Sequence, residues 1–214
     1  HATQLAGVLE RVADGALKRV LVMAPPRSGK SELISQLFTS YHVARFPERY
    51  VALSSYSAEL AHTLSRNARN YYREGLGLAS TSGELDTQAH WQTGSGGGLW
   101  AVGVRGSATG RGASLLICDD PQKDAQEAAS ETVQRSNLEW WYSTWMTRLE
   151  PGGSVIVVST RWEMKDLVGS LLAAEDGDAP ERWHVVNFPA VAEEPEPRRW
   201  PVTVTLEPDD RAPG

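Results

Sequence analysis

One stretch near the N-terminus limits what this chain can fold into more than any other part of the sequence. Residues 24–31 read Ala-Pro-Pro-Arg-Ser-Gly-Lys-Ser. An apolar run at residues 20–23 precedes them, and residues 32–38, with apolar side chains at helical spacing, follow. A strand, a tight loop ending in Gly-Lys-Ser and then a helix is the context of a phosphate-binding loop, or P-loop. The sequence therefore predicts an α/β fold in which this loop binds a nucleotide.

The residue types of the loop indicate how it would bind ATP. Backbone N–H groups of such a loop and the positive end of the following helix surround a polyphosphate. We expect Lys30 to pair with the β- and γ-phosphates and the Ser31 hydroxyl to ligate Mg²⁺. Ala24 stands where a first glycine is usual, so we expect its φ to stay negative. The residues expected to bind ATP are Pro26, Arg27, Ser28, Gly29, Lys30, Ser31 and Glu32.

A second predicted strand ends in two carboxylates. Residues 115–118 are Leu-Leu-Ile-Cys, and Asp119, Asp120 and Pro121 follow. Because ligands bind at the carboxyl ends of strands in open α/β sheets, we expect Asp119 to hold Mg²⁺ and Asp120 to orient or deprotonate a water. Each motif alone has a structural alternative: a chance Gly-Lys-Ser at a helix start, or a common Asp-Asp-Pro turn. Their occurrence together favours the nucleotide site.

Other polar residues lie at positions where they can join such a site. A β-branched run at residues 155–158 is followed by Ser159, Thr160 and Arg161, which are placed to sense a γ-phosphate or its departure. A mobile glycine-rich loop at residues 103–112 carries two arginines, Arg105 and Arg111. Gln4, ahead of the P-loop strand, is a candidate for reading an adenine edge, and a solvated helix residue is at least as good an explanation of it.

The remaining pattern alternates helices and strands. Apolar residues at helical spacing predict helices at 4–16, 58–74, 125–148 and 164–174. Apolar and aromatic runs predict further strands at 50–54 and 183–188, with a β-hairpin formed by 90–93 and 99–102. The helix at 58–74 has Arg66, Arg69 and Arg73 on one face, which is either a solvated face or a surface for a partner or DNA.

Composition narrows the class of protein. The 214 residues carry a formal net charge of −6, so nucleic acid would have to be bound by a local patch, an assembled ring or another domain. No apolar run approaches the roughly 20 residues of a membrane span, and the single cysteine, Cys118, excludes a disulfide framework and a Cys-based metal site. We predict a P-loop domain over residues 1–188 and an acidic, proline-rich linker over 189–214. Because the chain begins at His1 without Met, we expect it to be a fragment.

The three strand-end motifs, in this order, resemble the ATPase domain of large terminase subunits, the DNA-packaging motors of tailed bacteriophages and related viruses. The matching segments are residues 25–32, 109–121 and 147–162, and Asp166-Leu167-Val168-Gly169 continues the match. The resemblance covers nearly the whole chain. It implies a RecA-like fold of the ASCE class, with a mostly parallel central sheet flanked by helices. In that fold the strand ending at Ser159 lies between the two nucleotide-binding strands.

The resemblance also implies roles for the motif residues. Lys30, Ser31 and Asp119 bind Mg-ATP, and Asp120 is the catalytic carboxylate. Many terminases have Glu at the position of Asp120, and because Asp is one methylene shorter, the position of the water must be compensated. The family's coupling motif, which links hydrolysis to subdomain motion, is matched by Ser159, Thr160 and Arg161.

Large terminases work as rings on a portal, where an arginine of one subunit completes the site of its neighbour. Such an arginine is worth about 10³–10⁵ in rate in analogous NTPases. Arg111 ranks ahead of Arg105 because it is closer in sequence to the Asp119 strand, and Arg27 is a candidate within its own subunit. The implied partners are double-stranded DNA, the portal protein, the small terminase subunit and further copies of the chain. The implied location is the host cytoplasm, at the portal of the procapsid.

The leading functional prediction is ATP hydrolysis that drives translocation of double-stranded viral DNA into a procapsid. Large terminases usually carry a C-terminal nuclease domain, and its acidic cluster cannot be assembled from the residues after Pro189. One alternative is another P-loop ATPase, such as a helicase-like protein or a kinase. A second is a nucleotide-gated module for ring assembly that hydrolyses little ATP.

Overall fold

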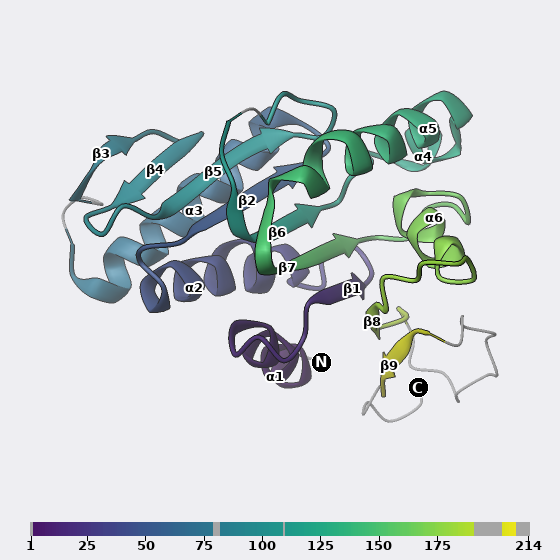
Figure 1. Ribbon diagram of the computed structural model, residues 1–214, viewed down its shortest axis with the longest axis horizontal. Helices are drawn as coiled ribbons and strands as arrows, with labels where there is room; N and C mark the ends of the chain where they lie inside the picture. Colours follow the sequence, from purple (N-terminus) through teal and green to yellow (C-terminus); the bar gives the residue numbers. More distant parts are fainter. Residues whose placement is uncertain (1, 79–81, 109, 191–202, 209–214) are drawn as a thin grey trace.

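A single twisted sheet organises the computed structural model, which describes residues 2–78, 82–108, 110–190 and 203–208 (Figure 1). Its strand order is β3-β4-β5-β2-β6-β7-β1-β8-β9. Strands β3, β4 and β5 pair antiparallel, and all other neighbours are parallel. The strands are β1 (Arg19–Met23), β2 (Tyr50–Ser55), β3 (Ser82–Asp86), β4 (His90–Thr93), β5 (Gly98–Gly103), β6 (Ala113–Asp119), β7 (Leu149–Ser159), β8 (His184–Asn187) and β9 (Thr205–Glu207).

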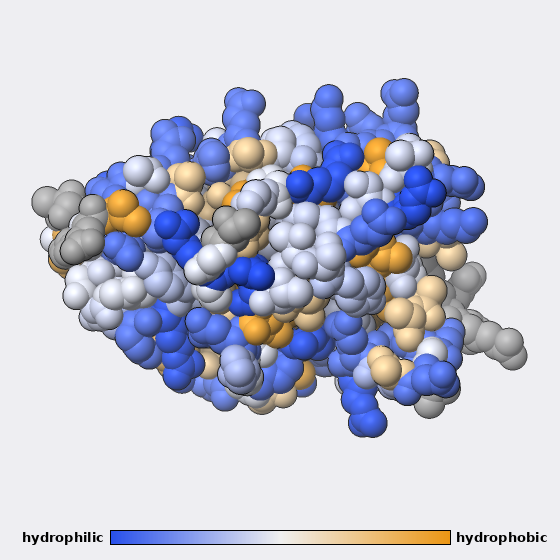
Figure 2. Space-filling view, turned by 45° about the horizontal axis from the view of Figure 1, so that its top comes forward, coloured by the Kyte–Doolittle hydropathy of each residue, from blue (hydrophilic) through white to orange (hydrophobic). Residues whose placement is uncertain are grey.

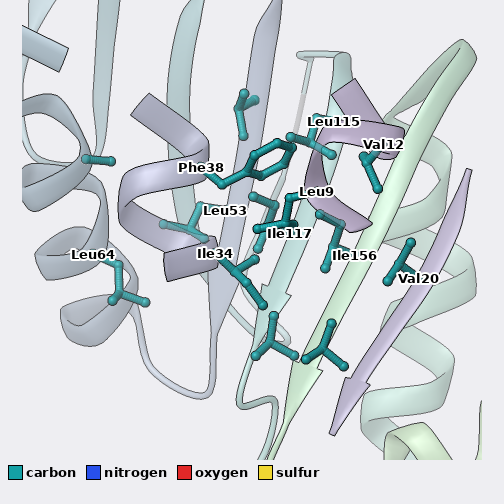
Figure 3. Close-up of a cluster of buried hydrophobic side chains, with 14 of the residues drawn as sticks. Leu9, Val12, Val20, Ile34, Phe38, Leu53, Leu64, Leu115, Ile117 and Ile156 are labelled. Atoms are coloured by element: carbon teal, nitrogen blue, oxygen red, sulfur yellow. The ribbon is translucent and has the colours of Figure 1, made fainter. Parts of the chain in front are cut away.

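Helices cover both faces of the sheet, so the fold is a three-layer α/β arrangement. One face is covered by α1 (Ala2–Ala13), the π-helical segment η1 (Glu32–Phe38), α2 (Thr39–Arg45) and α3 (Ala58–Leu76). Figure 3 shows the core on this face, where Leu9 and Phe38 lie over Ile117 and Ile156 of the central strands. The other face is covered by α5 (Glu131–Trp140), the π-helical turn η2 (Trp141–Trp145) and α6 (Leu167–Ala174).

The position of β7 confirms the RecA-like strand order of the ASCE class. β7 lies between β6 and β1 and is parallel to both. Their register places Met23 beside Ser159 and Asp119 beside Val158. The carboxyl ends of three strands therefore meet at one edge of the sheet, where the sequence puts its polar residues.

Most elements predicted from the sequence are present, and the hairpin is β4 and β5. The single helix predicted at 125–148 is wrong. The chain instead forms α4 (Ala125–Ala129), α5, η2 and a 3₁₀ turn, η3 (Met146–Arg148). The break after α4 arises because Ser130 is extended, with φ −77° and ψ 113°. Beyond α5 the wider π turn brings the rings of Trp140 and Trp145 into a stack 5.2 Å between centroids.

The C-terminal part of the chain contributes to the sheet. β9 pairs with β8 in parallel register, so described residues within 189–214 extend the sheet by one strand. The acidic stretch at 193–197 lies outside the described residues. The boundary between a P-loop domain and a linker at residue 188 stays a prediction. None of the helices in the described part of the chain is long and apolar enough to cross a membrane.

A buried histidine makes the stability of the fold sensitive to acid. The ring of His42 lies 5.9 Å from Phe38 and 5.0 Å from Phe46, and neither ring nitrogen has a hydrogen-bond partner within the described residues. Burial lowers the pKa of His42 from 6.5 to about 4, with smaller contributions from Arg49 and Arg45. The unfolded chain therefore binds a proton at a pH where the folded chain does not.

We predict that this group alone destabilises the protein by about 2 kcal/mol between pH 7 and pH 5. The contribution is complete above the unfolded pKa of 6.5 and is lost as the pH falls toward the folded value of about 4. A His42→Leu variant should lose that much less stability over the same interval in urea denaturation. Equal losses for the variant and the original protein would contradict the assignment.

Candidate nucleotide-binding site

The P-loop leaves the end of β1 with the backbone expected of a phosphate cradle. Two of its residues, Arg27 and Gly29, have positive φ angles of 60° and 81°. Ala24 does not, as predicted, and its N–H donates a hydrogen bond of 3.2 Å to the carbonyl of Ser159. The start of the loop is thus attached to the end of β7. Pro26 and Arg27 are exposed at the turn, and Ser28 is half-buried.

The P-loop helix brings two hydroxyls to the carboxylate at the end of β6. Ser31 Oγ lies 3.1 Å from Asp119 Oδ1, and Ser35 Oγ lies 2.6 Å from Asp119 Oδ2. Asp119 is 1% exposed, and its burial, with the nearby charge of Asp120, raises its pKa to about 6. Hydrogen bonds from Ser35 and Ser31 and the charge of Lys30 oppose that rise. Ser35 was missed from the sequence, although its spacing of four residues from Ser31 places both on one helix face.

Asp120 connects the P-loop to the third strand end. Its Oδ2 lies 3.1 Å from Lys30 Nζ, and its Oδ1 accepts a 2.8 Å hydrogen bond from the backbone N–H of Thr160. The Lys30 side chain is 7% exposed and that of Asp120 is 26% exposed, so the lysine is buried and its partner is partly open to solvent. The backbone of Asp120 has φ 44°, in the left-handed region that Asp and Asn tolerate better than most side chains. The arrangement gives one carboxylate contacts with both the predicted phosphate-binding lysine and the predicted coupling segment.

The three predicted coupling residues form a compact segment after β7. Ser159 is 2% exposed, and its hydroxyl donates to the carbonyl of Thr160 at 3.0 Å. Arg161 Nε lies 2.9 Å from Asp166 Oδ2, and its guanidinium also donates to the carbonyl of Glu163. Asp166 in turn caps α6, because its Oδ1 accepts the N–H of Gly169 at 2.8 Å. Arg161 therefore joins the end of β7 to the start of α6.

Two hollows flank the P-loop. The larger, of about 970 Å³, lies between Pro25, the segment after Thr160, α6 and Phe188. The smaller, of about 150 Å³, is lined by the N-terminal end of α1, residues 28–30 of the P-loop, η1 and Phe188. Gln4 lines neither hollow, and its side-chain amide donates to the carbonyl of Pro208. Its neighbours Ala2 and Leu5 line the smaller hollow with residues 28–30, whereas the Gln4 amide is directed to Pro208.

The sequence model of the family described as "Terminase large subunit, T4likevirus-type, N-terminal" matches residues 21–212. The chain belongs to this terminase family. The crystal structure of the HK97 bacteriophage large terminase is similar, with a TM-score of 0.53 and 19% sequence identity over 88% of this chain. That likeness concerns the fold, and the matched region spans 38% of the HK97 protein. Among curated proteins, none matches.

The two loop arginines of this terminase domain, Arg105 and Arg111, lie at opposite ends of the parallel strands. Arg105 follows the carboxyl end of β5, on the same edge as the P-loop, and forms a 3.1 Å ion pair with Glu127. Arg111 precedes the amino end of β6, whose seven residues span about 20 Å. Arg111 is exposed and has no ion pair within the described residues, although its charge contributes to a lowered pKa of His90. Arg111 is thus too distant to act on the P-loop of its own subunit.

The arginine row of α3 is partly explained by contacts within the terminase domain. Arg69 lies 2.8 Å from Asp86, and Arg73 pairs with the same carboxylate. These ion pairs attach α3 to β3, whereas Arg66 has no ion pair among the described residues. Two of the three side chains therefore serve the fold.

The residues at the end of β6 fit a magnesium ion. Mg²⁺ prefers oxygen ligands and is usually held by one or two carboxylates together with substrate phosphates. The Ser31 hydroxyl and the Asp119 carboxylate are already 3.1 Å apart and supply two such oxygens. No group of three His, Cys, Asp or Glu side chains in the described part of the chain forms an alternative cluster for a metal.

We expect the replacement of Asp120 by Asn to separate the predicted hydrolysis of ATP from its binding. Asn accepts the N–H of Thr160 and tolerates φ 44°, so the backbone should be preserved. We predict that Asp120→Asn retains affinity for a fluorescent ATP analogue and lowers phosphate release by about 10²–10⁴. An equal loss of binding and hydrolysis would instead identify Asp120 as a metal ligand.

Proposed function

We propose that this terminase domain hydrolyses ATP and that the hydrolysis drives packaging of double-stranded viral DNA. The observation that carries the proposal is the set of contacts made by Asp120. Its carboxylate contacts Lys30 of the P-loop and the backbone of Thr160 after β7. A group in this position can respond to phosphate and pass the response to a second segment.

The proposed chemistry begins with the exchange of partners by Lys30. A bound triphosphate competes for its ammonium group, which now pairs with Asp120 at 3.1 Å. Asp120 is then available to orient the attacking water and accept its proton. Mg²⁺, held by Ser31 and Asp119, would neutralise charge on the phosphates. Lys30 would stabilise the charge that develops in the transition state, in a site where it is 7% exposed.

Coupling would follow from the second oxygen of the same carboxylate. When Asp120 moves toward the water, its hydrogen bond to the N–H of Thr160 must lengthen or carry that backbone with it. Arg161, next in the chain, connects the displacement to α6 through Asp166. The assigned coupling role of Ser159, Thr160 and Arg161 is thus consistent with a mechanical path from phosphate to a helix.

The proposed setting is a homo-oligomeric ring on the portal of a procapsid, in the host cytoplasm, with the small terminase subunit and DNA as further partners. On the face shown in Figure 2, hydrophobic residues form separate patches among hydrophilic ones. With a net charge of −6, the DNA contact would be local and would depend on assembly. The proposed role of Arg111, which is exposed and distant from its own P-loop, is to act on a neighbouring subunit.

The primary test measures phosphate release by this chain with and without double-stranded DNA and portal protein. We predict that DNA and portal together raise turnover. Lys30→Ala should reduce turnover by about 10²–10³ under every condition while leaving the fold intact by circular dichroism. Turnover that persists in Lys30→Ala would reject the P-loop assignment. Turnover that depends on Lys30 and ignores DNA would reject the packaging function.

A mixing experiment tests the proposed arginine. We predict that Arg111→Ala lowers turnover by about 10³–10⁵, and that adding the inactive Lys30→Ala subunit restores part of it. The reason is that a Lys30→Ala subunit still supplies Arg111 to its neighbour. Arg105→Ala is the matched comparison, because Arg105 is held by Glu127. Absence of rescue at every mixing ratio would overturn action in trans.

A further inference from the structure

Ser35 is a buried polar residue that none of the sequence motifs assigns. It lies on η1, one turn beyond Ser31, and is 0% exposed. Its hydroxyl lies 2.6 Å from Asp119 Oδ2, and this contact is shorter than the 3.1 Å contact of Ser31 with the same carboxylate. A hydrogen bond from a hydroxyl to a carboxylate at this distance is among the stronger ones in proteins.

The hydrogen bond of Ser35 determines which way the Asp119 carboxylate faces. Rotation about the last torsion of an aspartate is broad, so burial alone does not orient its two oxygens. The Ser35 hydroxyl holds Oδ2, which leaves Oδ1 beside Ser31. The two hydroxyls therefore clamp the carboxylate from successive turns of one helix.

We propose that Ser35 is a positioning residue that orients Asp119 for magnesium, an inference that rests on the proposed nucleotide site. Ser35 would act on the ion only through Asp119, because its hydroxyl is directed to the oxygen that does not face Ser31. Outer partners of this kind typically change metal affinity by 10–100-fold. A purely structural hydrogen bond would change stability alone.

The test is the magnesium dependence of nucleotide binding, measured with a fluorescent ATP analogue. For Ser35→Ala, the Mg²⁺ concentration that gives half of the magnesium-dependent increase in affinity should rise about 10–100-fold. Affinity in EDTA should be unchanged, because the P-loop backbone and Lys30 are intact. Ser35→Cys retains the size of the side chain and a weaker donor, so its shift should lie between those of Ser and Ala.

Ser65→Ala is the matched control. Ser65 is also 0% exposed, on α3, and its hydroxyl accepts the indole N–H of Trp91 at 3.2 Å, away from the P-loop. This variant should lose stability and keep the original magnesium dependence.

The outcomes separate this inference from the proposed function. A folded Ser35→Ala variant with unchanged magnesium dependence overturns the positioning role while the nucleotide site stands. If Ser35→Ala does not fold, the magnesium dependence of nucleotide binding is measured with Ser35→Cys. A shift supports the positioning role, and an unchanged dependence overturns it. Failure of the original protein to bind nucleotide at any Mg²⁺ concentration would overturn the site itself, and the positioning role with it.

Discussion

The ion pair between Lys30 and Asp120 is the interaction on which the rest of the site depends. It joins a loop after β1 to the end of β6, two strands that are separated by β7. The pair can form only because the parallel register brings all three carboxyl ends to one edge. A largely shielded lysine without this partner would carry a substantial desolvation cost. The strand order therefore allows the ion pair to form, and the ion pair in turn offsets the cost of burying Lys30.

The sequence predicted the parts of the fold that local pattern determines. Apolar runs followed by polar residues identify β1, β6 and β7, because buried parallel strands are apolar throughout and their functional groups lie just beyond them. The prediction of one long helix at 125–148 was wrong because local pattern does not determine where this segment breaks. Its helical spacing continues through residues 125–148, whereas the chain breaks at the extended Ser130 and again where the π turn stacks Trp140 on Trp145.

For the candidate site, the sequence predicted which residues take part better than it predicted which side chains contact one another. The proximity of Lys30, Ser31, Asp119 and Asp120 followed from motif order. The spacing of Ser35 from Ser31 predicts a shared helix face, whereas its contact with Asp119 required the structure. Closeness along the chain was also a poor guide for Arg111, since a strand has two ends and this residue lies at the one opposite the P-loop. Distances within a sheet depend on strand direction as well as on order.

The contact between Arg161 and Asp166 links the segment after β7 to the N-terminal cap of α6. Asp166 binds the guanidinium of Arg161 and also caps α6. A displacement of the end of β7 would therefore disturb the hydrogen bond that caps this helix. A helix cap is worth about 1 kcal/mol, which is roughly twice the thermal energy. In the proposed coupling, a displacement of the end of β7 would therefore change the stability of the first turn of α6 by an amount of that order.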